Sequence, residues 1–358
     1  MNVQQPKNTF QAGRRQSRKL DLEHGRIELT HGAGGRAMAD LVDLMFRRAF
    51  DNPLLNQAND QASFDVEAGR MVMSTDSFVI SPLFFPGGNI GSLAVHGTVN
   101  DLAMGGAQPL YLTAGFILEE GLPLQDLARI VDSMAEAARE AGVLIVTGDT
   151  KVVERGKADG VFINTAGIGR VPAGLDISGD RARPGDKILL SGTVGDHGMA
   201  IMSLRNGLQF DTALQSDSAA LNGLVGRMVD AVGGAIRTLR DPTRGGLAAT
   251  LNEIADQSSV GIRLHETTIP VRTEVRGACE LLGLDPLNVA NEGKLIAIVD
   301  AATADTLLTA MRQDPKACDA AIIGEVIDDP LHLVRMVTGI GGERVVDWLH
   351  GEQLPRIC

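Results

Sequence analysis

Two periods of apolar residues alternate along the chain, and together they predict a mixed α/β protein. The segment "RIELTHGAGGRAMADLVDLMFRRAF" reads as a short strand, a glycine-rich turn and an amphipathic helix, with Leu41, Leu44, Met45 and Ala49 at helical spacing. Helical periodicity returns in "SLAVHGTVNDLAMGG" and stops at Gly105. Strands are expected at 70–80, 109–120, 143–153 and 160–171, and a further helix at 124–142. The first half is therefore strand-rich, with two or three helices.

The polar stretch "SGDRARPGD" has the composition of a linker, and we place a domain boundary near residue 180. The pattern restarts with the strand "KILLSGTV". Helices are then expected near 198–206, within 218–233, and at 246–258, 273–283 and 303–312, with strands near 260–264 and in "KLIAIVD", "AAIIGEV" and "LHLVRMV". Because 358 residues exceed the size of most single cores, we expect two domains. The division is a disordered basic arm (1–24), an N-terminal domain (25–180), a C-terminal domain (181–338) and a C-terminal tail (339–358).

Charge and cysteine usage exclude several classes of protein. The formal charge of -12 argues against bulk binding to nucleic acid, because neutralising phosphates needs a basic face. Cys279, Cys318 and Cys358 form no CxxC pair, so neither a zinc site nor a disulfide framework is indicated, and a reducing cytoplasm is the simplest setting. No apolar run approaches the roughly 18 residues of a membrane span, so we expect no membrane contact. The arm at 1–24 lacks the apolar core of a secretory signal.

Five polar residues stand where apolar ones would be expected, and they supply oxygen ligands. Asp76, Asp149 and Asp241 each end or follow an apolar run, and carboxylates there are costly to bury without a cation or a donor. Asn100 and Asp101 lie within an otherwise apolar helix. Oxygen donors without His or Cys partners suit Mg²⁺. The alternative is that these residues are helix caps and turn residues, and Asp241 before a proline and a helix suits an N-cap.

Glycine-rich turns could supply donors for an anion. The chain has neither GxxxxGK[ST] nor GxGxxG, so any nucleotide must be held in another way. "HGAGG", "GDHG" and "DPTRGG" each precede an expected helix, where backbone N–H groups can face an anion. Combined with the oxygen ligands, these turns point to a triphosphate. His197 in "GDHG" is as well suited to a turn or capping role as to a phosphate contact.

Two further residues could move protons. Lys151 lies two residues beyond Asp149, so on a continuing strand both side chains share a face, and the lysine could bind phosphate or act as a base. Glu292 in "ANEGK" could cap the following strand or act as a second base. Cys279 and Cys318 lie in apolar-patterned segments and are assigned no chemistry.

The chain ends in "GEQLPRIC", so Cys358 carries both a thiol and the α-carboxylate. Gly351 to Cys358 could span roughly 25 Å if extended, and Pro355 stiffens the tip. An arm of this length could enter a cleft and withdraw to meet a partner. The alternative is an incidental or tethering thiol. Prenylation is disfavoured because its motif needs three residues after the cysteine.

Several motifs together resemble the HypE family of hydrogenase maturation factors, which are carbamoyl dehydratases. They are "TDSFVISPLFFPGGNIG", "GTVNDLAMGGAQPLYLTAGFI", "TGDTKVV", "SGTVGDHGMAI", "RDPTRGGLAATLNEIA", "NEGK" and the terminal "GEQLPRIC". The resemblance runs from about Ile27 to Cys358. It implies a two-domain PurM-like α/β (α+β) fold, related to aminoimidazole ribonucleotide synthetase and selenophosphate synthetase. In that fold the N-terminal sheet pairs across a homodimer, and ATP with Mg²⁺ binds between the domains.

The same resemblance implies a function for the terminal cysteine. A HypF-type carbamoyltransferase loads Cys358 with a carbamoyl group, the protein uses ATP to dehydrate it to a thiocyanate, and a HypC–HypD-type complex accepts the cyanide for the iron of [NiFe]-hydrogenase. The family pattern makes Cys358, Lys151 and Glu292 catalytic. It assigns nucleotide binding to Asp76, Asn100, Asp101, Gly148, Asp149, Asp241 and Thr243, and metal binding to Asp76, Asp101 and Asp149. The competing hypotheses are a small-molecule kinase or synthetase of the same superfamily and a non-catalytic tethering protein.

Overall fold

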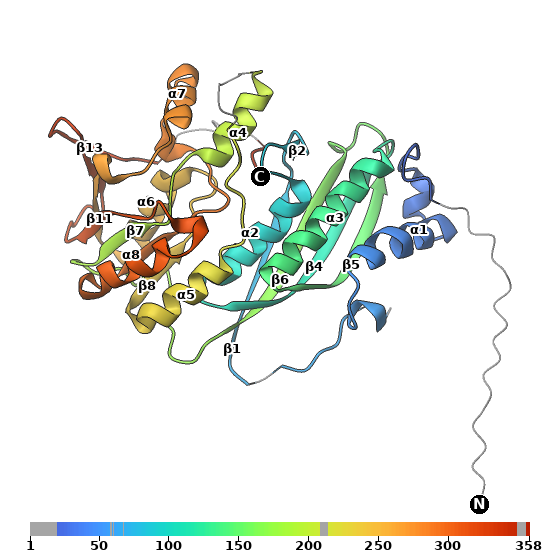
Figure 1. The fold of residues 1–358 in the computed structure, drawn as a ribbon, viewed down its shortest axis with the longest axis horizontal. Coiled ribbons are helices and arrows are strands. Elements are labelled where there is room, and N and C mark those ends of the chain that lie inside the picture. The colour runs from blue at the N-terminus through green and yellow to red at the C-terminus, as the bar shows by residue number, and fades with distance from the viewer. Residues whose placement is uncertain (1–19, 58, 60, 67, 208–213, 349–355) are drawn as a thin grey trace, which may run out of the picture.

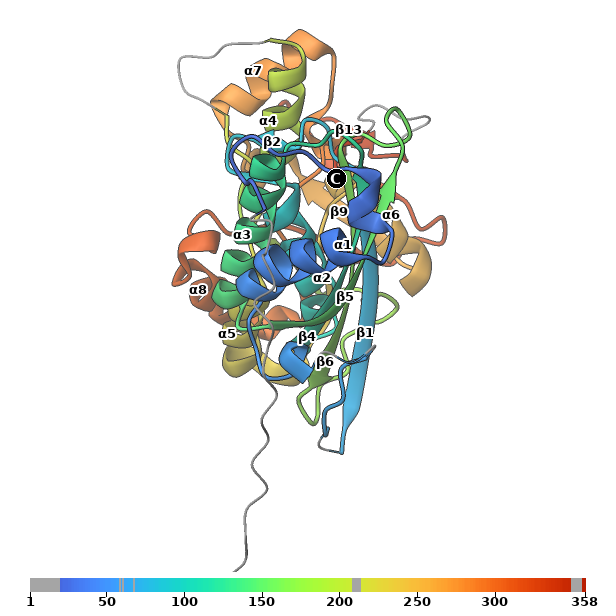
Figure 2. The same ribbon diagram turned by 90° about the vertical axis from the view of Figure 1, so that its right-hand side faces the viewer.

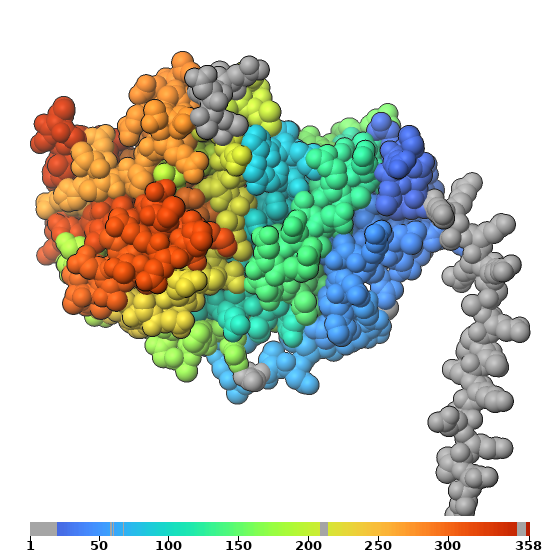
Figure 3. Space-filling view, viewed as in Figure 1, coloured from blue at the N-terminus to red at the C-terminus, as the bar shows by residue number. Residues whose placement is uncertain are grey.

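The computed structural model describes residues 20–57, 59, 61–66, 68–207, 214–348 and 356–358. These residues form two α/β domains that lie side by side and meet along a broad surface (Figures 1 and 3). Most of the basic arm expected at 1–24 lies outside the described residues. Its last part does not, and Leu20 and Leu22 pack against the apolar core of the N-terminal domain.

A four-stranded sheet forms the N-terminal domain, in the order β1-β6-β4-β5. The strands are β1 (Arg70–Phe78), β4 (Gln108–Glu119), β5 (Leu144–Val153) and β6 (Val161–Val171), and the helices are α1 (Arg36–Leu41), α2 (Ile90–Met104) and α3 (Leu124–Ala141). α1 continues into a wider helical turn at Val42–Arg47, and two short strands, β2 (Phe84–Phe85) and β3 (Gly88–Asn89), precede α2. β4 and β5 are parallel because α3 connects them, whereas the other pairs are antiparallel. The four strands of this sheet and the three helices were predicted, whereas β2 and β3 were not. The short strand expected before α1 is wrong, because Leu29–Gly32 forms a 3-10 turn.

The two faces of this sheet differ. Alternate residues of β4 and β6, such as Phe116 and Ile163, are buried under α2 and α3, as strand geometry requires. Figure 2 shows these helices on one side of the strands. On the opposite face, Met73 is 75% exposed and Ile117 43% exposed. The N-terminal sheet therefore has one packed face and one open face that carries apolar side chains.

Helix α2 connects the two domains. Asn89 caps its first turn by accepting hydrogen bonds from the backbone N–H groups of Gly91 and Ser92, and the helix ends at Gly105 as predicted. Nearly all of its residues are buried, because the sheet lies on one side and α3 and α5 on others. Ala103 and Met104 belong to an apolar cluster of the C-terminal domain. The domains thus share apolar packing along this helix.

The C-terminal domain contains a seven-stranded sheet in the order β13-β12-β9-β11-β7-β10-β8. Its strands are β7 (Lys187–Leu190), β8 (Ile236–Arg240), β9 (Gly261–His265), β10 (Ile296–Val299), β11 (Ala321–Ile327), β12 (Val334–Val337) and β13 (Glu343–Val345). Its helices are α4 (Asp196–Arg205), α5 (Asn222–Val232), α6 (Gly246–Ser258), α7 (Thr273–Leu282) and α8 (Ala304–Arg312). β12 pairs with β9 in parallel, and the other pairs of this sheet are antiparallel.

Two strands of the C-terminal sheet were missed by the sequence pattern. β8 follows a helix directly and mixes Arg with apolar residues, so its alternation is short and irregular. β13 has three exposed residues and lies within the segment expected to be the tail. The C-terminal sheet therefore extends beyond residue 338. None of the helices in the described part of the chain has the length and apolar character needed to span a bilayer.

Candidate active site

Three carboxylates from separate elements meet between the domains. Asp76 lies on β1, Asp101 on α2 and Asp241 directly after β8. Burial raises the pKa of Asp76 and of Asp101 above the ordinary value, and Asp76 raises that of Asp101 further. Ser74 partly offsets this by donating a 2.6 Å hydrogen bond to Asp101 Oδ2. The sequence predicted each of these residues, and the fold brings them together.

Asp241 is the most perturbed of the three carboxylates. Burial, and then the charges of Asp101 and Asp76, raise its pKa from 3.8 to about 7. The alternative role as an N-cap does not hold, because Gly245 is the N-cap of α6 and no side chain caps that helix. Asp241 instead faces its two carboxylate neighbours, and this arrangement is unfavourable without a cation.

The cluster fits a metal that is shared with another ligand. Within the described residues, no group of three or more His, Cys, Asp or Glu side chains is arranged to hold a metal ion alone. Mg²⁺ in nucleotide-binding proteins usually takes one or two carboxylates and completes its octahedron with phosphate oxygens and water. The mutual repulsion of Asp76, Asp101 and Asp241 is the feature that a divalent cation would relieve.

Asn100 has a structural role that was not predicted from the sequence, which is to join the two domains by hydrogen bonds. Its side chain is 1% exposed. Its Nδ2 donates to the backbone carbonyls of Ala219 (3.0 Å) and Glu292 (3.3 Å), and its Oδ1 accepts from the N–H of Leu221 at 2.8 Å. The predicted nucleotide contact of Asn100 is therefore unsupported here, because its amide already joins α2 to the C-terminal domain.

Glu292 lies on a tightly held loop beside this junction. The carboxylate of Asp217 accepts hydrogen bonds from the N–H groups of Glu292 (3.1 Å) and Gly293 (3.2 Å), and Lys294 Nζ lies 3.3 Å from it. A Cβ at Gly293 would lie 1.8 Å from the Asp217 carbonyl oxygen, so the approach requires glycine. The Glu292 side chain is 4% exposed, and its Oε1 has no hydrogen-bond partner among the described residues.

The environment of Glu292 favours its protonated form. Burial is the main cause of its raised pKa, and the charges of Asp217, Asp241 and Asp76 raise it further, while Arg244 opposes them. A buried carboxyl with a raised pKa is a candidate for proton exchange, because its carboxylate form binds a proton more strongly than a solvated one does. Once it has lost its proton, Glu292 is therefore suited to the predicted role of a base.

The end of the chain lies in the same place. Figure 1 shows the C-terminus between the two domains, near β2 and α4. Ile357 is 3% exposed, and Cys358 packs against the apolar core. Burial and then the charge of Glu292 raise the pKa of the Cys358 thiol far above its ordinary value, whereas Arg244 lowers it. The thiol therefore lies close to Glu292, Arg244 and Asp76.

His197 contacts the tail. This histidine is fully buried, and its Nε2 lies 2.7 Å from the carbonyl oxygen of Ile357. Because a carbonyl can only accept, Nε2 carries the proton, and Nδ1 accepts from Ser216 Oγ at 2.7 Å. Burial lowers the pKa of His197, which is consistent with this neutral form. Both ring nitrogens are thus used, and the predicted alternatives of a phosphate contact or a cap give way to tail binding.

Asp149 and Lys151 lie apart from this cluster. In the sheet register, Asp76 pairs with Thr165 on the helix-covered face, whereas Asp149 pairs with Gly115 on the open face. Three strand spacings, roughly 14 Å, also separate β1 from β5. Lys151 Nζ lies 2.9 Å from Asp149 Oδ2, and this lysine lowers the pKa of Asp149. Within one chain, the fold does not bring Asp149 to the other two predicted metal ligands.

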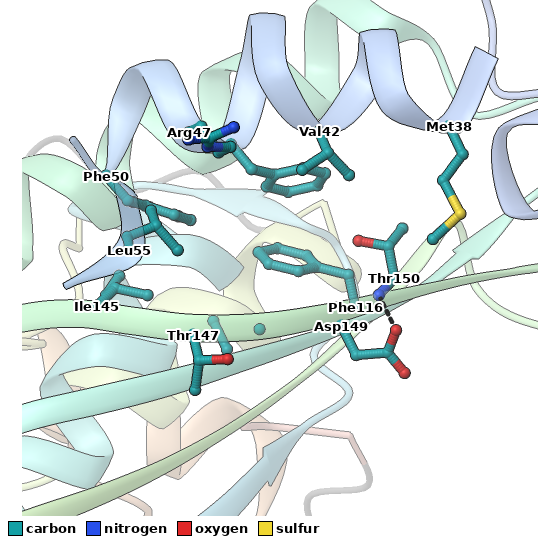
Figure 4. A pocket seen from close by; sticks show the side chains of 13 residues that line it. Met38, Val42, Arg47, Phe50, Leu55, Phe116, Ile145, Thr147, Asp149 and Thr150 are labelled. Atoms are coloured by element: carbon teal, nitrogen blue, oxygen red, sulfur yellow. Dashed lines mark hydrogen bonds between the residues drawn. The ribbon is translucent and has the colours of Figure 1, made fainter. Parts of the chain in front are cut away.

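An apolar pocket adjoins Asp149 at the edge of β5. Figure 4 shows Val42 and Met38 on one side, Phe116 in the centre, and Asp149 pointing to the other side of the strand. The cavity measures about 120 Å³, and its wall also includes Phe46, whose ring is tilted by 46° against that of Phe116 with centroids 4.7 Å apart. A second hollow continues from the same residues to the predicted anion-binding turn and measures about 390 Å³.

Glycines line the polar end of this pocket. Gly35 is the N-cap of α1, and Gly34 and Gly35 border the second hollow together with Gly148. A Cβ at Gly148 would lie 2.3 Å from the carbonyl oxygen of Ala114, so a side chain is not tolerated there. An apolar cavity that opens on glycine-rich backbone is suited to a base at one end and phosphates at the other.

Several functional neighbours were not predicted from sequence. The turn "DPTRGG" was noted for its backbone donors and for Thr243, whose N–H bonds the Asp241 carbonyl at 3.0 Å, but Arg244 was not considered. Arg244 is exposed, yet its charge reaches Asp76, Asp101, Glu292 and Cys358. The only signal in the sequence was a cation beside Asp241 in a glycine-rich turn.

The chain is similar to known proteins in both sequence and fold. Residues 58–171 match the family model "AIR synthase related protein, N-terminal domain", and residues 183–336 match the C-terminal domain of the same family. Carbamoyl dehydratase HypE of Rhizobium leguminosarum bv. viciae is 64% identical over 341 residues, which cover 95% of this chain and 97% of that protein. A crystal structure of the hydrogenase maturation protein HypE in complex with ATP superimposes with a TM-score of 0.89 at 54% identity, over 92% of this chain and 99% of that one. In a crystal structure of a HypE–HypF complex, a matching chain gives a TM-score of 0.77 at 52% identity, over 86% of this chain and 99% of that one.

Proposed function

Because the chain belongs to the AIR synthase related family and, within it, to the HypE carbamoyl dehydratases, we propose that it dehydrates a carbamoyl group on the thiol of its own Cys358. The product is a thiocyanate, which supplies the cyanide ligand for the iron of [NiFe]-hydrogenase. ATP is consumed, and ADP and phosphate are released. The observation that carries the proposal is the position of Cys358, whose thiol lies between the domains beside Glu292 and the carboxylate cluster.

The chemistry divides into an activation and an elimination. The carbamoyl oxygen attacks the γ-phosphorus of ATP, the bond to the β-phosphate oxygen breaks, and ADP leaves. The oxygen then departs with its phosphoryl group as phosphate, while the carbamoyl nitrogen loses both protons and S–C≡N forms. Activation is needed because an amide oxygen is otherwise a poor leaving group. Two basic groups are needed for the nitrogen, and these are the roles proposed for Glu292 and Lys151.

Glu292 is suited to the first proton. Its carboxyl lies close to the Cys358 thiol and is shielded from water, so its pKa is raised and its carboxylate form is a stronger base. The charge of Arg244 acts on both groups, and this guanidinium would orient the negatively charged phosphoryl oxygens. Asp76, Asp101 and Asp241 would hold Mg²⁺, which neutralises charge on those oxygens when bound.

Nucleotide binding is proposed for the pocket at the edge of β5. The base would occupy the apolar cavity beside Phe116 and Met38, and the phosphates would lie along Gly148 and the turn at Gly34 and Gly35. The ATP complex of a 54% identical relative supports binding of this cofactor. The phosphates would then leave the pocket next to Asp149 and Lys151, on the open face of the sheet.

A homodimer would explain how these separated parts cooperate. The open face carries the exposed apolar residues Met73, Val79 and Ile117, and the last two line a hollow together with Asp149 and Lys151. Pairing this face with a second copy would bury the apolar residues and partly desolvate the lysine. Asp149 and Lys151 of one copy would then contribute to the cleft of the other, as the family pattern requires.

The proposed partners follow from the reaction. A HypF-type carbamoyltransferase would load Cys358, and the HypE–HypF complex of a 52% identical relative supports this partner. A HypC–HypD-type complex would accept the cyanide. We place the protein in the cytoplasm, where a free thiol at Cys358 is maintained, and Cys279 and Cys318 are also free.

Mass spectrometry of the C-terminal peptide tests the proposal, because it distinguishes a free thiol, a thiocarbamate and a thiocyanate. After incubation with the carbamoyltransferase, carbamoyl phosphate and ATP, the protein should reach the thiocyanate. Cys358→Ala should accept no carbamoyl group. Glu292→Gln and Lys151→Ala should be loaded normally but should lose roughly 100-fold or more in the rate of dehydration. Thiocyanate formation at the normal rate in both variants would remove them from the mechanism.

A further inference from the structure

The last three residues of the chain are held by side chains from both domains. On the C-terminal domain, His197 donates to the carbonyl of Ile357, and Arg205 donates to the carbonyl of Arg356. On the N-terminal domain, Asp159 forms an ion pair with the guanidinium of Arg356. These contacts engage two successive main-chain carbonyls and one charged side chain, so they constrain both the direction and the register of the tail.

Main-chain groups of the N-terminal domain complete this arrangement. The N–H of Val79 donates to the Cys358 carboxylate at 3.2 Å, and the N–H of Ser81 donates to the Arg356 carbonyl at 3.4 Å. Arg205 Nε also donates to the Ser81 carbonyl at 2.5 Å, which fixes the guanidinium between the loop and the tail. The tail therefore lies beside the segment that follows β1, the strand that carries Asp76.

One apolar contact anchors the tail. The Ile357 side chain is 3% exposed and belongs to the apolar core of the N-terminal domain. The ring of Phe85 meets His197 edge-on at 5.6 Å, which holds the imidazole that binds the Ile357 carbonyl. The requirements are thus a cation at 356, an apolar side chain at 357 and a small reactive residue at 358.

We propose that His197, Arg205 and Asp159 form a docking site for residues 356–358 and set how often Cys358 occupies the cleft. The docking itself is independent of the chemistry, whereas its effect on dehydration rests on the proposed function. In the docked tail the Cys358 thiol is partly buried and lies beside carboxylates between the domains, while loading by another enzyme requires it to leave. His197 and Arg205 are positioning residues, since the contacts described here join them to main-chain carbonyls of the tail.

The binding must be reversible, and the contacts are suited to this. Most of them are hydrogen bonds that water can replace when the tail withdraws. The ion pair between Asp159 and Arg356 is partly exposed, with side chains 36% and 56% accessible, so it contributes modestly. Ile357 is the single side chain of the three whose release exposes a large apolar surface. Weakening one polar contact should therefore shift the docked fraction without abolishing docking.

Thiol reactivity measures the docked fraction directly in the full-length protein. Iodoacetamide must reach the sulfur atom, so the partly buried Cys358 of a docked tail should be alkylated at least tenfold more slowly than the exposed Cys318 of the same chain. Asp159→Asn should speed alkylation of Cys358 about twofold to fivefold, and His197→Ala about tenfold. Cys318 is an internal standard, and Asp328→Asn, an exposed carboxylate outside the docking site, is the matched control.

Exchanging the charges of Asp159 and Arg356 distinguishes a lost ion pair from a general loss of structure. Asp159→Arg and Arg356→Asp should each speed alkylation of Cys358, and the double variant should return it toward the rate of the unmodified protein. Equal rates at Cys358 and Cys318 in the unmodified protein would overturn the docking site. The docking site would also be overturned if alkylation in the double variant showed the sum of the two single effects.

Single-turnover dehydration then tests the consequence for the reaction. Asp159→Asn, once loaded with the carbamoyl group, should form thiocyanate about twofold to fivefold more slowly, whereas its loading should be at least as fast as normal. Equal slowing of both steps would contradict a role in partitioning the tail. If no protein forms thiocyanate but Cys358 remains protected from alkylation, the proposed function fails and the docking site stands.

Discussion

Replacing Asp241 by Asn should stabilise the protein in the absence of metal and nucleotide, by an amount that grows from about pH 4 and is complete above about pH 7. The side chain keeps its size and the backbone before Pro242 is unchanged, so the substitution removes one charge from a crowded cluster. Asp241 lies against Asp101 and Asp76, and burial together with their charges raises its pKa from 3.8 to about 7. A stabilising substitution at a site of this kind is a known consequence of building function from mutually repelling groups.

The magnitude follows from that rise in pKa. The unfolded chain releases the proton near pH 4, whereas the folded chain keeps it until about pH 7, so the free energy of unfolding falls as the pH rises between these values. A tenfold change in proton affinity corresponds to about 1.4 kcal/mol, which gives a loss of at most about 4 kcal/mol above pH 7. Asn cannot ionise, so the variant should lack this loss.

Urea unfolding followed by circular dichroism, at a series of pH values from 4 to 8.5, measures the effect. The variant should match the original protein near pH 4 and should be more stable by up to about 4 kcal/mol at pH 8. Asp328→Asn, an exposed carboxylate, should show no such pH-dependent gain. Mg²⁺ with ATP at 100 times its dissociation constant should stabilise the original protein by about 2.7 kcal/mol and the variant by much less.

Two results would refute this reasoning about Asp241. A stability difference that is the same at pH 4 and pH 8 would mean that the substitution acts through packing rather than charge. Undiminished stabilisation of the variant by Mg²⁺ and ATP would mean that Asp241 takes no part in binding them.

Three further predictions concern other parts of the site. Asp217→Asn removes a charge that raises the pKa of Glu292, so the acidic limb of the pH–rate profile for dehydration should move to lower pH. An unchanged limb would exclude an effect of Asp217 on the titration of Glu292. Met73→Asp places a charge on the open sheet face, so the mass measured by light scattering should fall from about twice 37.8 kDa to that of a monomer. A mass that stays at the dimer value would exclude this face as the dimer interface. Met38→Glu charges the wall of the pocket beside β5 and should weaken ATP binding at least tenfold by calorimetry, whereas unchanged affinity would place the base elsewhere.

Local pattern predicted most of the secondary structure. The helix at α3 and the strands of the N-terminal sheet follow from apolar spacing, because periodicity depends on near neighbours in the chain. The stop at Gly105 followed from the same reasoning. β8 and β13 were missed because short strands with charged or exposed residues acquire their structure from pairing partners rather than from their own sequence.

The sequence by itself determined the two-domain α/β organisation, the carboxylates at the ends of apolar runs and the terminal cysteine, since each is a local feature. Tertiary structure alone decided which of these meet. Register places Asp76 and Asp149 on opposite faces of one sheet, because neighbouring residues of a strand point to opposite sides and the pairing of distant strands fixes which side is covered. The same long-range packing brings Glu292 and His197 to the end of the chain, and no spacing in the sequence specifies that contact.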